Sequence, residues 1–149
     1  MSSNRSVALL IVSSLACSLG ATPATAQMVC DNATASCTKQ LTVRPGGSVV
    51  LMPGASSINP DCSFRPLNLN VQVRPKQGRV VPRLIAKTIE ASGAFNTSSP
   101  SNCVGRPTKG LQVTYYANRN ASGSDEVVVR ITGPGPGRAG MFRFRIAIQ

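Results

Sequence analysis

The sequence predicts an all-β protein built as an antiparallel sandwich, preceded by a cleaved N-terminal signal peptide. Short segments alternate between apolar and polar residues, the period of two that marks a half-buried strand. Gly and Pro interrupt these segments repeatedly, with 13 Gly and 11 Pro among the 149 residues. Closely spaced strands separated by such turn residues are typical of a sandwich or barrel.

Residues 1–26 have the order of a secretory signal peptide. Arg5 supplies a basic start, the run Val7–Ala16 is apolar, and Ala24–Ala26 offers small residues at the cleavage position. The apolar run is too short to cross a bilayer core of roughly 30 Å as a helix, which needs about 20 residues. We therefore expect cleavage before Gln27 and a periplasmic or secreted product without a transmembrane segment. An uncleaved signal that acts as an anchor is the alternative.

Four of the five cysteines remain after this cleavage, and in an exported chain an even number indicates disulfides. Three pairings are possible. Cys30 and Cys37 flank a short polar loop and can close it locally, and Cys62 and Cys103 would then join distant segments. Catalytic or metal-binding cysteines are the alternative, but no C-x-x-C motif occurs and no histidine is present to complete a mixed ligand set. Lipidation of Cys17, within the signal, is a further alternative.

After the expected cleavage, the chain is predicted to begin with an irregular lead-in over 27–39 and to continue as one domain over 40–149. The strands of its N-terminal half are less clearly marked than those of the C-terminal third. Strands are expected at four places, each bounded by Gly or Pro: Leu41–Val43, Val49–Met52, Leu67–Arg74 and Val80–Val81. The segment Leu84–Ala91 fits either a strand or one to two turns of helix. Its β-branched residues and its β context favour a strand. A long loop is expected over Ser92–Pro107, held by Cys103.

Alternation is clearest in the C-terminal third, over Leu111–Tyr116, Val127–Thr132 and Phe142–Ile148. Each segment has one apolar face and one largely polar face, as in an antiparallel sheet with one face in water. Gly133–Arg138 joins the last two as an extended hairpin loop. We expect the core to include Val71, Val73, Leu111, Val113, Val129, Ile131, Phe142, Phe144 and Ile146.

Two stretches of the chain are similar to signatures of a known family. The first is Val73–Val80 (VRPKQGRV), with a P-x-x-G-x-V turn, and the second is Gly110–Tyr115 (GLQVTY) followed by Ser122–Val129 (SGSDEVVV). They resemble bacterial extracellular immunoglobulin-like and cadherin-like domains. Over Gln40–Gln149 the resemblance implies an immunoglobulin-like antiparallel β-sandwich with an adhesive, structural or binding role. Calcium binding is not carried over, because the acidic clusters of cadherin repeats are absent and Val127 replaces the usual aromatic residue.

The residue types exclude several classes of chemistry. Without histidine, Ser-His-Asp and Cys-His mechanisms are impossible, and neither a phosphate-binding P-loop nor a dinucleotide-binding motif occurs. Asp125 and Glu126 are the only close acidic pair, and neighbouring strand residues point to opposite faces. Asp125 is expected to accept backbone N–H bonds at its hairpin turn. We therefore expect no catalytic residues, no metal, no cofactor and no enzymatic activity.

The chain is strongly basic, with a net charge of +11, or one less without Arg5. In an exported protein this charge favours anionic envelope polymers, lipid headgroups or acidic partner proteins over a specific nucleic acid. An ordinary solvated basic surface is the alternative. The sequence indicates neither a specific ligand nor an oligomeric state.

Arginines gather on one predicted surface. If Val127–Thr132 and Met141–Ile148 pair as a hairpin, one outer face carries Arg130, Arg143 and Arg145. Tyr116 would join this face if Leu111–Tyr116 lies in the same sheet, and Arg138 would lie at the loop tip. Like charges on neighbouring strands destabilise a sheet unless an anion compensates them. This face is therefore the candidate anion-binding site.

The function expected from the sequence is that of an exported, non-catalytic binding or structural module of the bacterial cell envelope. Its basic sheet face would engage an anionic envelope polymer or an acidic protein. The alternative is a small secreted inhibitor or effector that acts on a host or competitor target, with the proline-glycine hairpin loop as its reactive tip.

Overall fold

The protein is described by a computed structural model over residues 27–31, 36–91, 99–134 and 139–149. The expected signal peptide and its cleavage position lie outside these ranges. The strands are β1 Met28–Asp31, β2 Ser36–Val43, β3 Ser48–Ala55, β4 Ser57–Ile58, β5 Phe64–Arg65, β6 Asn68–Val73, β7 Gly78–Thr88, β8 Pro107–Ala117, β9 Gly123–Thr132 and β10 Ala139–Ile148. A short 3₁₀ turn, η2, covers Ser101–Cys103. Within the described ranges, no helix has the length and hydropathy to span a bilayer.

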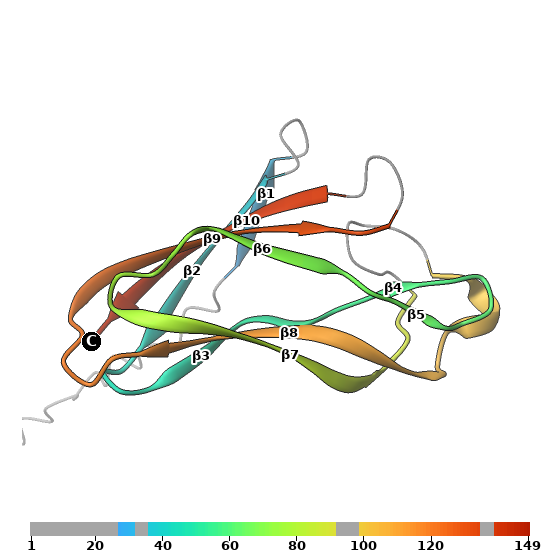
Figure 1. Cartoon of the computed structure of the whole chain (residues 1–149), viewed down its shortest axis with the longest axis horizontal. Coiled ribbons are helices and arrows are strands. Elements are labelled where there is room, and N and C mark those ends of the chain that lie inside the picture. Colours follow the sequence, from blue (N-terminus) through green and yellow to red (C-terminus); the bar gives the residue numbers. More distant parts are fainter. Residues whose placement is uncertain (1–26, 32–35, 92–98, 135–138) are drawn as a thin grey trace, which may run out of the picture.

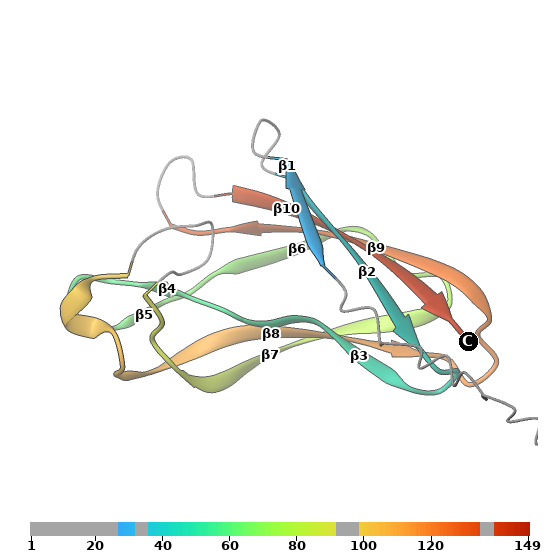
Figure 2. The same cartoon turned by 180° about the vertical axis from the view of Figure 1, so that it is seen from behind.

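The strands form two larger sheets that face each other as layers (Figures 1 and 2). One has five strands in the order β1-β2-β10-β9-β6, and the other has three in the order β3-β8-β7. The small β4-β5 pair lies at one end of the molecule. The predicted all-β class is confirmed.

The prediction of a purely antiparallel architecture is wrong at one junction. β2 and β10 pair in parallel, with Leu41 opposite Ile146. These strands come from opposite ends of the described chain, so no hairpin fixes their relative direction. The alternation within each strand, which carried the prediction, says nothing about the direction of its neighbour.

In the expected irregular lead-in over 27–39, residues 28–31 and 36–39 are instead strand, and residues 32–35 lie outside the described ranges. β1 pairs with the first half of β2, which in turn pairs with β10. This segment is mostly polar, so no alternation marks it in the sequence. Its extended conformation is held by ladder hydrogen bonds and by the Cys30–Cys37 disulfide, which joins directly opposite residues.

The core lies between the two larger sheets and is built mainly from β8, β9 and β10. Six expected core residues are buried, namely Leu111, Val113, Val129, Ile131, Phe144 and Ile146. Val71 and Phe142 are partly buried against them. Val73 is 41% exposed, so its assignment to the core is wrong. A β-bulge shifts the register between Val71 and Val73, and such a bulge turns the next side chain to the opposite face.

The ambiguous segment Leu84–Ala91 is strand as far as Thr88, because it continues β7. This strand pairs along its whole length with β8, from Gly78 opposite Ala117 to Thr88 opposite Pro107. Ladder pairing therefore decided between the two conformations that the residues allow. In the expected loop Ser92–Pro107, residues 92–98 lie outside the described ranges.

Within the described ranges two disulfides are formed, Cys30–Cys37 and Cys62–Cys103. Of the three pairings that the sequence allows, this is the one in which Cys30 and Cys37 close locally. The second disulfide joins the β4-β5 hairpin to η2, and Cys103 is fully buried. The long crosslink therefore holds together two segments that share no ladder.

Removing the two disulfides is expected to have unequal effects. In the chain-entropy account, a crosslink with a sequence separation of 41 contributes about 4 kcal/mol and one of 7 about 2 kcal/mol. The Cys62→Ala, Cys103→Ala variant should therefore lose about twice the free energy of unfolding lost by Cys30→Ala, Cys37→Ala. Urea unfolding followed by circular dichroism measures both, and equal losses would contradict this ranking.

Candidate functional site

The candidate site begins from the pairing of β9 with β10. Residues directly opposite each other in a ladder point to the same face. Arg130 is opposite Met141, Arg143 is opposite Val128, and Arg145 is opposite Glu126. These positions alternate with the buried residues of the same strands. All three arginines therefore lie on the outer face of the five-stranded sheet, as the hairpin pairing predicts.

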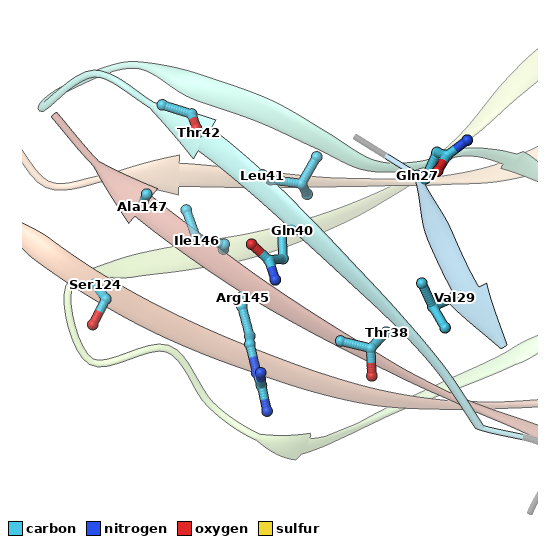
Figure 3. A pocket seen from close by; sticks show the side chains of 10 residues that line it. All are labelled: Gln27, Val29, Thr38, Gln40, Leu41, Thr42, Ser124, Arg145, Ile146 and Ala147. Carbon is cyan, nitrogen blue, oxygen red and sulfur yellow. The ribbon is translucent and has the colours of Figure 1, made fainter. Parts of the chain in front are cut away.

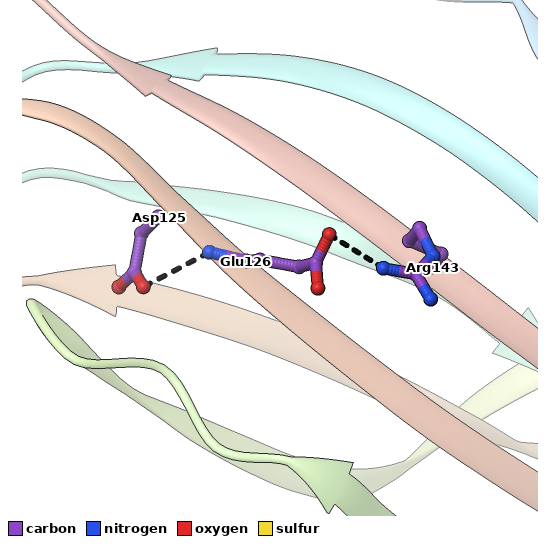
Figure 4. A network of polar contacts seen from close by, with 3 residues as sticks. All are labelled: Asp125, Glu126 and Arg143. Carbon is purple, nitrogen blue, oxygen red and sulfur yellow. Dashed lines mark hydrogen bonds and ion pairs between the residues drawn. The ribbon is translucent and has the colours of Figure 1, made fainter.

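The three arginines differ in their partners. Arg143 Nη1 donates to Glu126 Oε2 at 2.7 Å, an ion pair between two partly exposed side chains (Figure 4). Arg130 and Arg145 are exposed, and the structure shows no ion pair for either within the described ranges. The positive charge on this face that is available to a ligand is thus smaller than the sequence suggested.

Tyr116 does not belong to this face, and the prediction that placed it there is wrong. It lies on β8, which belongs to the three-stranded sheet on the other side of the core. There the guanidinium carbon of Arg79 is 5.4 Å from the centre of the Tyr116 ring, a cation–π contact. Periodicity gave Tyr116 the correct outward direction but did not show which sheet β8 joins. Arg138 lies outside the described residues.

Arg145 stands where two hollows in the outer surface meet. One is a groove of about 420 Å³ between β9, β10 and the β6–β7 turn, and we call it the basic groove. Its lining includes Arg74, Lys76 and Arg145 together with Asp125 and Glu126. The second hollow, about 760 Å³, extends from Arg145 over β2 towards β1 (Figure 3).

Asp125 fixes the shape of the basic groove. Its carboxylate is only 8% exposed and accepts four hydrogen bonds. Oδ1 accepts from the backbone N–H groups of Lys76 and Glu126, each at 2.9 Å. Oδ2 accepts from the Gln77 backbone N–H and from the Tyr115 hydroxyl, also at 2.9 Å each. The carboxylate thus anchors the β6–β7 turn to the start of β9.

These bonds also control ionisation. Burial on its own would raise the pKa of Asp125, but the four donors favour the charged carboxylate and lower its pKa below the ordinary value. Burial and the neighbouring Asp125 charge raise the pKa of Tyr115, so its hydroxyl stays protonated as a donor. Asp125 accepts backbone N–H bonds, as the sequence predicts. Two of those donors, however, come from a turn that is distant in sequence.

The two stretches that resemble the extracellular domains meet at this point. Gly78, the glycine of the P-x-x-G-x-V turn, lies against Tyr115 and the backbone of Tyr116. A Cβ atom there would collide with the Tyr116 carbonyl oxygen and lie 2.6 Å from Tyr115 Cε2. Glycine at this position and Asp125 on β9 therefore serve one purpose, which is to seat the β6–β7 turn on the edge of the core.

The groove presents cations because its acidic side chains are already bonded. Asp125 is saturated by its four donors, and Glu126 is held by Arg143. Arg74, Lys76 and Arg145 are exposed and make no ion pair within the described part of the chain. Sequence reasoning missed Arg74 and Lys76. They flank Pro75 in the turn motif, but only the bonds to Asp125 bring them beside Arg145.

The arrangement offers little to acid–base or metal chemistry. Asp125 points inward and Glu126 outward, so the two carboxylates do not converge (Figure 4). Across the described ranges, no three His, Cys, Asp or Glu residues lie close enough together to hold a metal ion. What the site can do is bind a carboxylate or phosphate group through arginine and lysine.

Comparisons with known proteins add no family. No family model and no curated protein matches the chain. Among solved structures, the solution structure of Amebosin is similar, with 12% identity and a TM-score of 0.40 over 76% of this chain and 96% of that one. A likeness of this size carries no argument about fold or function.

Proposed function

We propose that this protein is an exported, non-catalytic binding module of the bacterial cell envelope that engages an anionic envelope component through its basic groove. The observation that carries the proposal is the convergence of Arg74, Lys76 and Arg145 on one groove whose acidic side chains are already bonded. Such a cluster is self-repelling in the free protein and is relieved by a bound anion.

The strand order supports an immunoglobulin-like form. In that fold one sheet contains strands B, E and D and the other contains G, F and C. Here β3-β8-β7 would correspond to B-E-D, and β10-β9-β6 to G-F-C. β2 would then be an A strand that pairs with G. The chain departs from the antibody pattern because neither disulfide joins the two sheets at strands B and F.

Two observations support export. Both disulfides that four cysteines allow are formed, and such bonds persist mainly in oxidising compartments outside the cytoplasm. Residues 1–26 have the order of a secretory signal. The bacterial envelope is favoured by the resemblance of the turn and β9 signatures, whose key residues Gly78 and Asp125 contribute to one anchored turn.

The chemistry of the groove favours an extended polyanion. Two arginines can each form paired hydrogen bonds with a carboxylate or phosphate, and lysine adds a point charge. The second hollow continues from Arg145 along β2, where Thr38, Gln40 and Thr42 offer polar side chains to a longer ligand (Figure 3). Repeated anionic units could therefore follow the outer face of the sheet.

The triple variant Arg74→Gln, Lys76→Gln, Arg145→Gln is expected to bind polygalacturonate at least about tenfold more weakly than the unmodified protein, because three cationic contacts are lost. Isothermal titration calorimetry at low and high salt measures this affinity. The slope of affinity against salt should also become shallower. Polygalacturonate serves as a soluble probe of polymeric carboxylate.

The matched control is Arg83→Gln, Arg106→Gln, Lys109→Gln, which removes the same charge from exposed positions outside the groove. It should bind almost as well as the unmodified protein. Equal weakening by both triple variants would show that net charge alone drives binding, and the assignment of the groove would fail.

A further inference from the structure

Three turns meet at one end of the molecule, the end that holds the last residue of β10 (Figures 1 and 2). They are the β2–β3 turn at 44–47, the β6–β7 turn at 74–77 and the β8–β9 turn at 118–122. Gly46 N donates to Asn118 O at 2.9 Å, and Asn118 N donates to Gln77 O at 2.8 Å. These bonds tie the three turns into one platform.

The Gln77 side chain strengthens this platform. Its Nε2 donates to the carbonyl oxygens of Ser122 and Ser124 at 2.8 and 3.0 Å, and its Oε1 accepts from Ser122 N at 2.9 Å. With Asp125 holding Lys76 N and Gln77 N, the β6–β7 turn is fixed by both backbone and side-chain bonds. The turn tips are therefore held in a defined arrangement relative to one another.

Every one of these turns carries an exposed cation: Arg44, Arg74, Lys76 and Arg119. A Cβ placed on Gly46 would lie 3.5 Å from Arg119 Cγ, so the stem of Arg119 lies against the turn that carries Arg44. None of the four makes an ion pair among the described residues. Together they form what we call the basic end.

We propose that the basic end docks end-on onto a lipid bilayer that bears anionic headgroups. This goes beyond the proposed function, because Arg44 and Arg119 do not line the basic groove, and rests on it only for export to a compartment bounded by a membrane. The four cations come from three turns at one end, with Arg74 and Lys76 on the same turn. A flat array of headgroups can contact all four cations at once. A single polymer chain in the basic groove contacts only Arg74 and Lys76, which lie beside Arg145.

The contact would be electrostatic. The large exposed apolar residues of the described chain do not include any within the three turns, so nothing in the turns is suited to insert into the acyl region. Basic residues near an anionic surface each strengthen binding by about 1 kcal/mol, which is about fivefold per residue, and the effect fades within a Debye length. Binding should therefore be reversible and lost at high salt.

The test uses vesicle co-sedimentation with mixed phosphatidylglycerol and phosphatidylcholine, against vesicles of phosphatidylcholine alone. The unmodified protein should bind only the anionic vesicles. The variant Arg44→Gln, Arg119→Gln should bind them about 25-fold more weakly, since two contacts of about fivefold each are lost. The control Arg83→Gln, Arg106→Gln should retain most of the binding. Circular dichroism verifies that each variant is folded.

The same variants in the polygalacturonate titration separate the two proposals. Arg44→Gln, Arg119→Gln should leave polymer binding nearly unchanged, because neither residue lines the groove. If the protein binds the polymer but ignores anionic vesicles, docking on a bilayer is refuted while the groove proposal stands. Vesicle binding without polymer binding would refute the groove proposal and support docking. Equal weakening of vesicle binding by both double variants would refute the basic end as a specific surface.

Discussion

Replacing Asp125 by Ala is expected to lower the free energy of unfolding by about 3 kcal/mol or more. The substitution leaves the Tyr115 hydroxyl and three backbone N–H groups without their acceptor. An unsatisfied buried donor costs about 1–3 kcal/mol, and water entering at the turn can relieve only some of them. Urea unfolding followed by circular dichroism measures the change.

The neighbouring residue provides the control. Glu126→Ala removes a carboxylate one position along the same strand, but its partner Arg143 is partly exposed. An ion pair of this kind contributes about 0–1 kcal/mol, so Glu126→Ala should be nearly neutral. If both variants lost the same stability, the buried network around Asp125 would not be what anchors the turn.

The same carboxylate predicts a dependence of stability on pH. The pKa of Asp125 is lower in the folded protein than in the unfolded chain, where it is about 3.9. The contribution of Asp125 to the free energy of unfolding is therefore complete above about pH 4. It is lost as the pH falls through the pKa of the folded state. In Asp125→Asn this acid-dependent loss should be smaller. An unchanged acid profile in the variant would contradict the role of Asp125.

The opposite sign holds for Tyr115. Its pKa is raised in the folded state, so its contribution is complete below the ordinary value of 10.0 and declines as the pH rises above it. Tyr115→Phe should lower stability at neutral pH, because the bond to Asp125 is lost. The free energy of unfolding of this variant should also decline less steeply as the pH rises above 10.0. The bond between Tyr115 and Asp125 contributes to both the acid and the base dependence. The larger causes are the backbone N–H groups of Lys76 and Gln77 for the lowered pKa of Asp125 and burial for the raised pKa of Tyr115.

Gly78→Ala is expected to be the second strongly destabilising change, by about 3 kcal/mol. The added methyl group would meet the Tyr116 carbonyl oxygen and the fully buried ring of Tyr115. Neither can move without disturbing the β7–β8 ladder or the bond to Asp125. The loss of stability should appear in the urea midpoint, together with a change in near-ultraviolet circular dichroism from Tyr115.

The control for this change is Gly123→Ala. Gly123 has a φ of +78°, but a Cβ there would meet no heavy atom within 4 Å. Its cost should therefore be limited to that of a left-handed backbone, about 1–2 kcal/mol. Gly78 is not in the positive-φ region, so its cost would be steric alone. A smaller loss for Gly78→Ala than for Gly123→Ala would contradict the close approach described above.

The outer face of β9 and β10 shows what the alternation of residues along a strand can predict and what it cannot. Alternation placed Arg130, Arg143 and Arg145 on one side of a hairpin, and the ladder has them there. The same reasoning failed for Val73, where one extra residue in the strand reverses the alternation. The alternation of apolar and polar residues does not predict where a bulge occurs. The bulge is set by how the strand must bend to pair with β9.

Asp125 illustrates the second limit. Its position at the start of a strand suggested local N–H donors, but its bonds to Lys76 and Gln77 span 49 and 48 positions of sequence. Contacts of that separation depend on how two sheets stack, and no spacing rule within one segment encodes them. The basic groove could therefore not be predicted from the sequence, because it forms only where the β6–β7 turn lies beside β10.

The sequence by itself determined the β class, the inward and outward sides of most strands and a supply of cysteines suited to two crosslinks. These properties are local, because side-chain alternation and turn residues act over a few positions of the chain. Only the tertiary structure decided that β8 lies across the core from β9, that β2 runs parallel to β10 and that cations from three turns share one end. The physical reason is that each strand edge offers the same hydrogen-bonding groups to any neighbour, so partners are selected by the packing of the whole core.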